Sequence, residues 1–172
     1  MARAPFRRRQ DVIEASLDLG EAAILTRLCH ELSSLFSAPP AVAGEEDADP
    51  VLQRLFPRAY LDPTEEKAEA EWQALVHGEL VEGRHRAIST VERTLDGARP
   101  RRGRLEVTLT EDEAEAWLSV INDARLALGT RLDVTEDLDF SGLDPDDPET
   151  APYAVYWWLG LLEEHLVEVL SG

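Results

Sequence analysis

Hydrophobic side chains recur every three or four residues along five stretches of this chain, the spacing that places them on one face of an α-helix. Two stretches begin with capping boxes, Asp18-Leu-Gly-Glu21 and Thr110-Glu-Asp-Glu113. Two others begin with Asp-Pro, which puts proline at the first helical position, where its missing N–H is not needed. We therefore expect helices over residues 18–36, 50–56, 62–95, 110–128 and 153–170.

Two short stretches are predicted to form β-strands. Residues 104–109 alternate apolar with polar side chains, as a half-buried strand does, and the short mixed stretch 12–17 also reads as a strand. Each ends in leucine and is followed by a capping box. This likeness fits either an internal duplication or a coincidence of two helix starts. Because a single strand is only marginally stable, we expect the two to pair with each other.

Three further features shape the expected helices. Gly78 and Gly83 weaken the middle of the long helix, so a bend or break over 78–84 is possible there, and Gly129 is the expected stop of the fourth helix. The first half of the last helix, from Tyr153, has almost no polar face. A helix that is apolar all round is buried on all sides, either in the centre of the fold or at an oligomer contact, which makes a homodimer a further expectation.

The expected fold is mainly α: a single-domain helical bundle of about five helices with a small two-stranded β element, its last helix central to the core. One domain is expected over residues 1–172. Its less regular parts are a basic N-terminal arm (1–11), a flexible loop rich in proline and acid (37–49), a basic link (97–104) and an acidic loop (135–149).

Charge and cysteine content narrow the class of protein. Lys and Arg number 17 against 35 Asp and Glu, for a net charge of −18. This balance argues against a general affinity for nucleic acid, because such affinity is largely phosphate neutralisation. The one cysteine, Cys29, permits no intrachain disulfide and is expected to be a buried thiol. No secretion signal is visible, and no apolar stretch reaches the roughly 20 residues that span a bilayer. We expect a cytoplasmic protein without a membrane partner.

Arginine is concentrated just before the two expected strands. The two clusters hold eight of the 17 basic residues: Arg3, Arg7, Arg8, Arg9, Arg99, Arg101, Arg102 and Arg104. If the strands pair, the clusters converge into a patch that can engage an acidic protein surface or, less readily, nucleic acid. The alternative is that both clusters are solvated tails without a role. The candidate partner-binding residues are Arg7, Arg8, Arg9, Arg101, Arg102 and Arg104.

No motif for catalysis, metal binding or cofactor binding stands out in the sequence. Glu82-Gly-Arg-His85 has the Glu-x-x-His spacing of di-metal helical bundles, but no convincing second pair accompanies it. Phosphate-cradling glycine loops and nucleophile motifs are missing. We therefore predict no catalytic residue, no metal and no cofactor. An enzyme remains an alternative, with a site assembled from distant residues around Tyr60 and Arg125.

Three segments resemble an uncharacterised, mainly actinobacterial family of domains of unknown function. They are residues 50–63 with Arg54-Leu-Phe-Pro-Arg-Ala-Tyr60, residues 116–137 with Asn122-Asp-Ala-Arg-Leu-Ala-Leu-Gly-Thr-Arg-Leu132, and residues 153–167. With the N-terminal arginines, the likeness covers nearly the whole chain. The chain departs from the family pattern at 70–74, where a more basic run is expected. The resemblance implies genes near the adaptor of the Clp protease, a metalloprotease and a sulfur-carrier protein, and a transcriptional-regulator label for some members.

The polar residues of these motifs form a second group of candidates: Arg54, Tyr60, Asn122, Asp123, Arg125 and Arg131. They could bind a carboxylate or a peptide backbone, or they could satisfy buried polar groups within the fold, and the structural role is favoured. The expected function is that of a non-enzymatic cytoplasmic regulatory or adaptor protein that binds a protein partner, with Clp protease components as the partner implied by the resemblance. The alternatives are a transcription-associated DNA-binding regulator and the enzyme described above.

Overall fold

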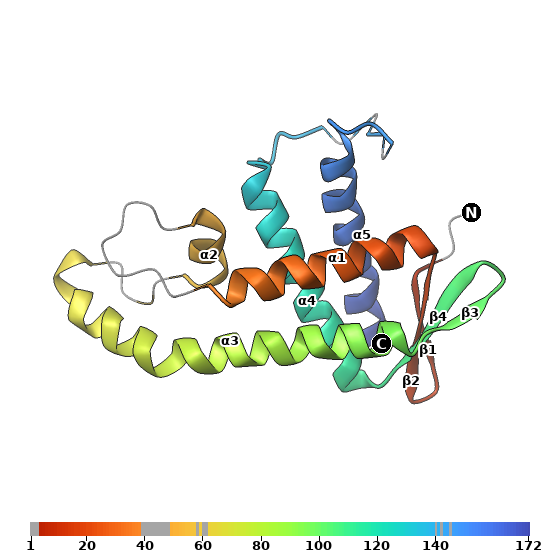
Figure 1. Ribbon diagram of the computed structural model, residues 1–172, viewed down its shortest axis with the longest axis horizontal. Coiled ribbons are helices and arrows are strands. Elements are labelled where there is room, and N and C mark those ends of the chain that lie inside the picture. The colour runs from red at the N-terminus through yellow and green to blue at the C-terminus, as the bar shows by residue number, and fades with distance from the viewer. Residues whose placement is uncertain are drawn as a thin grey trace.

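Helices make up most of the computed structural model, which describes residues 4–38, 49–57, 59, 62–139, 141, 143–144 and 146–172. Within these residues there are five α-helices (Figure 1), and a single 3₁₀ turn at Pro63–Glu65 leads into the third. The helices are α1 (Leu19–Phe36), α2 (Pro50–Leu55), α3 (Glu66–Asp96), α4 (Glu111–Arg131) and α5 (Ala151–Ser171). Helices α1 and α3 run side by side, and α4 and α5 cross them steeply (Figure 1).

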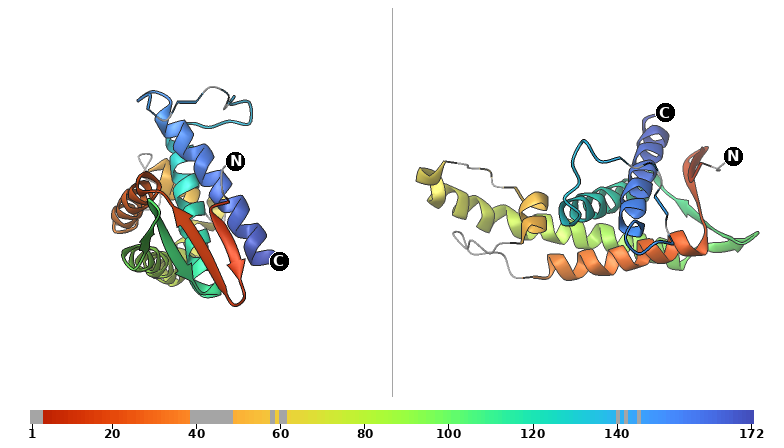
Figure 2. Two further views of the ribbon diagram at one scale, coloured as in Figure 1. Left: turned by 90° about the vertical axis from the view of Figure 1, so that its right-hand side faces the viewer. Right: turned by 90° about the horizontal axis from the view of Figure 1, so that it is seen from above.

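The strands form a single antiparallel sheet of four in the described part of the chain, in the order β1-β2-β4-β3. They are β1 (Phe6–Arg9), β2 (Val12–Leu17), β3 (Arg99–Arg101) and β4 (Arg104–Leu109). The expected pairing of 12–17 with 104–109 is confirmed as the central pair, with Ile13 opposite Leu109 and Leu17 opposite Leu105. The sheet lies across one end of the helices (Figure 2).

The expectation of a two-stranded element is wrong, because both arginine clusters fold back as outer strands. Each outer strand joins its neighbour through a tight turn, at Gln10-Asp11 and at Arg102-Gly103. Positive φ angles at Gln10 (53°), Arg102 (51°) and Gly103 (77°) make these turns possible. The basic arm and the basic link therefore contribute ordered strands to the sheet.

The core lies between the inner face of the sheet and the helices. Ile13, Ala15 and Leu17 of β2 are at most 1% exposed, and Val107 and Leu109 of β4 join them. Trp117 of α4 is fully buried against them, and its indole N–H donates to the Thr94 hydroxyl at 2.9 Å. The edge of the Phe6 ring meets Trp117 at 6.1 Å between centroids. One aromatic side chain thus joins β1, α3 and α4.

Both predicted capping boxes are confirmed. The Asp18 carboxylate accepts from the Glu21 N–H at 2.8 Å, and the Glu21 carboxylate accepts from the Asp18 N–H at 2.7 Å. Thr110 and Glu113 make the same reciprocal bonds at the start of α4. Each box fixes the point at which a central strand turns into a helix.

The glycines behave differently from expectation. Helix α3 is continuous through Gly78 and Gly83. The predicted stop at Gly129 is wrong, because α4 continues to Arg131. A Cβ added at Gly129 would lie 2.8 Å from the Tyr156 ring. The missing side chain therefore allows α5 to pack closely on α4 and does not end the helix.

Helix α5 is less central than its composition predicts. Its buried residues, Leu159, Leu162 and Leu166, lie three and four residues apart and so share one side of the helix. In the first half Trp157 is 51% exposed. The expectation that this half is buried in the centre of the fold is wrong, since only one side of α5 packs on α4. That the first half of α5 forms a homodimer contact stays a prediction.

The expected surface loops are described only in part. Residues 39–48 of the loop at 37–49 lie outside the described residues. In the acidic loop, the carboxylates of Asp139, Asp144 and Asp147 accept from backbone N–H groups two residues on, which gives a series of turns. A search of the described helices for one long and apolar enough to cross a membrane finds none.

Candidate functional site

The outer face of the sheet carries most of the candidate arginines. Residues directly opposite each other in neighbouring strands share a face, and Arg7 lies opposite Glu14, Arg99 opposite Glu106, and Arg101 opposite Arg104. Because the inner face holds Ile13, Val107 and their apolar neighbours, these residues face outward. We call this outer surface the arginine face; its charged residues are Arg7, Arg9, Glu14, Arg99, Arg101, Arg104 and Glu106.

The two arginine clusters share this face without merging. Strands β1 and β3 are the outermost strands of the sheet, and β2 and β4 separate them. Because β2 and β4 are antiparallel, the two hairpin turns also lie at opposite ends of the sheet (Figure 1). The arginine face thus has two basic margins, with Glu14 and Glu106 on the strands between them.

Ion pairs within the fold hold four of these arginines. Arg7 and Arg9 both contact the Glu14 carboxylate, at 2.6 and 3.1 Å, and the hydrogen bond from Arg7 is the main reason that the pKa of Glu14 lies below its ordinary value. Arg101 lies 3.3 Å from Glu106. Arg104 contacts Glu21 at 3.2 Å and donates to the Ser16 carbonyl at 2.8 Å, which ties β4 to β2 and α1.

Arg8 differs from the other candidates because its side chain turns inward, with the alternation of β1. Its Nε donates to the Val169 carbonyl at 3.0 Å, and its guanidinium lies 3.6 Å from Glu111. Arg8 therefore joins β1 to the end of α5 and the start of α4. These contacts give Arg8 a structural role that requires no binding partner.

Arg99 and Arg102 keep free guanidinium groups. Neither makes an ion pair or hydrogen bond with another described residue, and both are exposed. Arg102 lies at the turn between β3 and β4, and Arg99 lies on β3. Arg99 on the arginine face and Arg102 at the turn beside it therefore carry positive charge that no described residue neutralises.

The motif polar residues do not form one site. Arg54 is exposed on α2, Asn122 is half-buried on α4, and Tyr60 lies outside the described residues. Arg125 pairs with Glu163 at 3.0 Å and lies over the Tyr156 ring at 5.1 Å, so it joins α4 to α5. Asp123 and Arg131 make separate contacts with α3 and α1.

The buried Asp123 pairs with a half-buried arginine of α3 that sequence reasoning missed. The Arg84 guanidinium of α3 pairs with its carboxylate, donates to the Leu55 carbonyl at 3.0 Å, and lies 4.8 Å from the centre of the Phe56 ring. Burial raises the pKa of Asp123, and Arg84 partly offsets that rise. The sequence showed Arg84 only inside Glu82-Gly-Arg-His85. Among the described residues, no three His, Cys, Asp or Glu side chains group closely enough to hold a metal.

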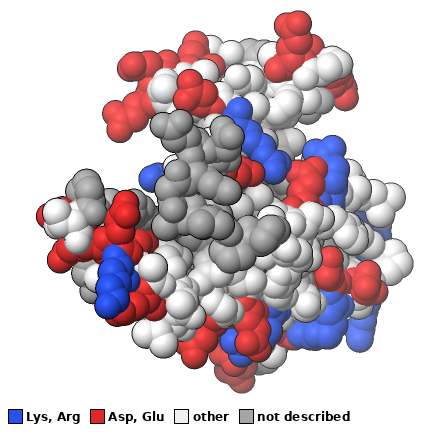
Figure 3. All heavy atoms as spheres, turned by 60° about the vertical axis from the view of Figure 1, so that its left-hand side comes forward, with Lys and Arg blue, Asp and Glu red and all other residues white. Residues whose placement is uncertain are grey.

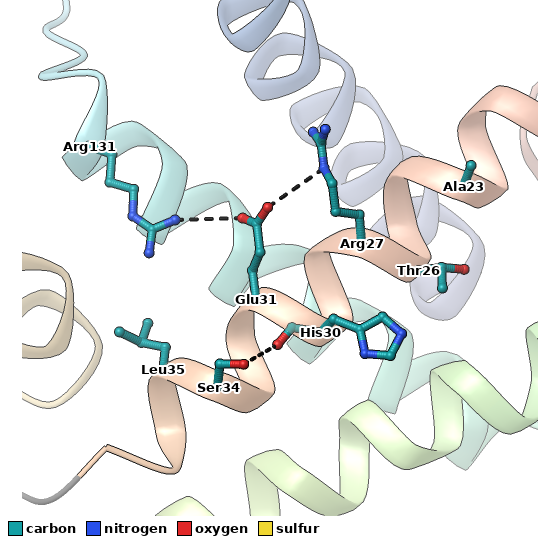
Figure 4. Close-up of a pocket in the computed structure, with 8 residues that line it drawn as sticks. All are labelled: Ala23, Thr26, Arg27, His30, Glu31, Ser34, Leu35 and Arg131. Atoms are coloured by element: carbon teal, nitrogen blue, oxygen red, sulfur yellow. Dashed lines mark hydrogen bonds and ion pairs between the residues drawn. The ribbon is translucent and has the colours of Figure 1, made fainter.

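A hollow of about 830 Å³ lies where the C-terminal end of α4 projects past α1 (Figure 4). Its lining comes from α1 together with Arg131: Ala23, Thr26, Arg27, His30, Glu31, Ser34, Leu35 and Arg131. The Glu31 carboxylate lies between Arg27 and Arg131, 3.6 Å from each. Of these residues only Arg131 was a candidate from the sequence, because outward-facing polar positions on a helix carry no signal of a hollow.

One group of acidic residues lies at the end of α4 that is remote from the sheet. On the side shown in Figure 3, Asp and Glu side chains cover the upper lobe, where Figure 1 places the loop between α4 and α5. The sheet lies at the other end of α4, which is about 30 Å long.

Comparison with known proteins gives a family and named relatives. A family model described as "Domain of unknown function (DUF2017)" matches residues 2–170. Proteins of Mycobacterium tuberculosis and Mycobacterium bovis named "Oxidative stress regulator AosR" are 33% identical over 184 residues, covering 92% of this chain and 82% of theirs. No solved structure matches the chain.

Proposed function

This chain belongs to the DUF2017 family, and from that membership we propose that it is a regulatory protein that acts by binding another protein through its arginine face. The observation that carries the proposal is the charge of that face: five arginines against two glutamates, on a chain whose net charge is −18. The regulator name of the mycobacterial relatives supports the regulatory part. The partner it fits is an acidic protein surface.

Two features of the face favour a protein partner. The paired arginines of the face are already oriented by Glu14, Glu106 and Glu21, so little side-chain entropy is lost on binding. The free groups of Arg99 and Arg102 supply donors for carboxylates, which planar guanidinium binds in a bidentate manner. These two residues are therefore expected to contribute most to affinity.

A DNA-binding regulator is the second candidate, favoured by the same arginine face. Opposing it is the net charge of −18, since a duplex repels the acidic body of the molecule at low salt. Titration of a fluorescent duplex at about 50 mM and about 150 mM salt separates the two candidates. A saturable complex that Arg99→Glu weakens would favour DNA as the partner.

Regulation in response to oxidants does not act through a disulfide within these residues, which hold one cysteine. Cys29 is 0% exposed, and burial, with a smaller effect of Glu92, raises its pKa to about 12. The thiolate is the reactive form, so this thiol is unreactive in the folded chain. We propose that a role of the kind in the relatives' name would reach this chain through its partner.

For the identity of that partner we propose components of the Clp protease system, and with them a cytoplasmic, non-enzymatic adaptor role. The support is the gene neighbourhood implied by the family resemblance. The test is direct titration of purified full-length protein against the purified Clp adaptor, the Clp ATPase and the Clp peptidase, by biolayer interferometry. Saturable binding to one component is expected. No binding to any of the three overturns the Clp proposal.

A charge-matched pair of variants tests the surface. Arg99→Glu with Arg102→Glu is expected to weaken binding by about tenfold or more, since both guanidinium groups are uncommitted. Lys67→Glu with Arg86→Glu changes the net charge equally on α3, where both side chains are exposed, and leaves affinity within about twofold. Equal losses in the two double variants would show that overall charge, and not the arginine face, determines binding.

A further inference from the structure

The hollow between α1 and α4 holds more positive charge than its own acid can neutralise. Arg27 Nε and Arg131 Nη1 both approach the Glu31 carboxylate, so two guanidinium groups share one carboxylate. In Figure 4 the carboxylate lies between them, and the Nη atoms of Arg27 point away from it. The three side chains together carry one net positive charge.

The contacts in this cluster are loose. Both separations are 3.6 Å, beyond hydrogen-bonding distance, and neither guanidinium donates a hydrogen bond to any described residue. Side-chain exposures of 65% for Arg27, 48% for Arg131 and 46% for Glu31 leave all three accessible from solvent. By contrast, Arg7 and Arg104 on the sheet donate hydrogen bonds at 2.6 and 2.8 Å.

The hollow is shallow and open to solvent, and its volume leaves room for a small molecule. Its volume of about 830 Å³ is within the usual range for ligand sites, roughly 300–1,000 Å³. A narrower crevice of about 20 Å³ between α1 and α4 shares Glu31 and Arg131 with it and is otherwise lined by apolar residues such as Leu28 and Leu128. The charged cluster thus lies over an apolar base.

We infer that this hollow is a binding site for a small anionic molecule, whose carboxylate or phosphate group binds between Arg27 and Arg131 in place of the Glu31 carboxylate. An oxyanion there can accept hydrogen bonds from the free N–H groups of both arginines. The Glu31 carboxylate, held on α1, lies too far from those N–H groups to accept from them. Because one arginine belongs to α1 and the other to α4, the ligand joins the two helices. This site is separate from the arginine face, which lies at the other end of α4.

The direction in which Glu31→Gln changes the affinity for an anion tests this inference. If its carboxylate occupies the position of the ligand, Glu31→Gln removes a competing charge and tightens binding, by about fivefold for loss of two weak ion pairs. If Glu31 only positions the arginines, the same substitution weakens binding or leaves it unchanged. Both outcomes are measurable in one titration.

The experiment follows the arginine Nε–H resonances of the full-length protein by NMR during titration with inorganic phosphate and, separately, with acetate, at constant ionic strength. Saturable shifts of Arg27 and Arg131 are expected, and Arg27→Gln and Arg131→Gln each weaken the response by about fivefold. Arg86→Gln, an exposed arginine on α3, is the matched control. Circular dichroism of each variant verifies the fold.

Tighter binding of phosphate identifies a phosphate-bearing ligand, and tighter binding of acetate identifies a carboxylate ligand. The inference is overturned by shifts that rise without saturation for both anions, by equal responses in the Arg86→Gln and Arg131→Gln proteins, or by a Glu31→Gln protein that binds no more tightly than the parent chain.

Discussion

The Arg84 guanidinium and the Asp123 carboxylate form a buried ion pair between α3 and α4, in which Asp123 is only 4% exposed. The pair is surrounded by the Phe36 and Phe56 rings, with the Arg84 Cζ 5.5 and 4.8 Å from their centres. Arg84 also donates to the Leu55 carbonyl at the end of α2. One side chain of α3 therefore fixes the positions of α2 and α4.

Arg84→Met is expected to lower the free energy of unfolding by about 3 kcal/mol, because it leaves the Asp123 carboxylate buried without a partner. Urea denaturation followed by circular dichroism at pH 7.5 measures the change. Arg86→Met, on the exposed side of the same helix, is the control and should change stability by less than about 0.5 kcal/mol. Similar losses in both variants would contradict a structural role for the pair.

The cost of Arg84→Met should depend on pH. Burial raises the pKa of Asp123 and Arg84 lowers it, so removal of Arg84 raises that pKa further. A group whose pKa is raised on folding stabilises the folded state at low pH, and this stabilisation is lost as pH rises through the folded pKa. The deficit of the variant is therefore largest at neutral pH and shrinks as pH falls toward the pKa of Asp123. Denaturation of both proteins at pH 7.5 and pH 5 tests this, and a deficit that grows on acidification would oppose it.

Cys29 should be unreactive toward a thiol reagent in the folded protein. It is fully buried, and with a pKa of about 12 almost none of it is thiolate at pH 8. Reaction with Ellman's reagent at pH 8 is expected to be slow without denaturant and to release one equivalent quickly in 6 M guanidinium chloride. Fast release from the folded protein would show that the thiol is accessible.

Gly129 and Gly78 should respond oppositely to alanine. At Gly129 a Cβ would lie 2.8 Å from the Tyr156 ring, so Gly129→Ala must displace that ring and is expected to destabilise by about 1 kcal/mol. At Gly78 the added Cβ meets no side chain and no other element within 4 Å, and Gly78→Ala is expected to stabilise α3 by about 0.5–1 kcal/mol. Thermal unfolding compares the two. Stabilisation by both substitutions would argue against close packing of α4 on α5.

Thr94→Val should leave the Trp117 indole N–H without its partner inside the core. An unmet buried donor costs about 1–3 kcal/mol, and valine keeps the shape of threonine. Thr90→Val, one turn earlier on α3, removes only a hydroxyl that bonds to the Arg86 carbonyl of its own helix and should cost less than about 0.5 kcal/mol. Chemical denaturation of the two variants, followed by circular dichroism, makes the comparison.

Local signals in the sequence were sufficient for the helices and the central strands. Asp18 and Thr110 mark helix starts because a capping box needs only residues three apart, and 104–109 alternates over its own length. Strands β1 and β3 lacked such a signal. Strand β1 is four residues long and β3 is three. Apart from Phe6 and Pro100 they consist of arginine, so apolar and polar side chains do not alternate over a length that predicts a strand.

Contacts between side chains that are far apart in the sequence could not be predicted, because a local pattern carries no information about them. Asp123 was a candidate from its motif, but its partner Arg84 is 39 residues away. The Gly129 prediction failed because glycine near the end of a helical pattern signals a stop, whereas here it accommodates Tyr156 from another helix. The cluster of Arg27, Glu31 and Arg131 arises only from the packing of α1 against α4.

Strand β3 is the last strand of the sheet, only three residues long, with a proline at its centre and arginine on either side. Proline offers no N–H to a further strand, and the flanking charges repel a second copy of the same segment. The sheet is therefore closed to growth at this edge. At the high concentrations used for expression and crystallisation, chains that meet at this edge should separate again and not build ordered aggregates.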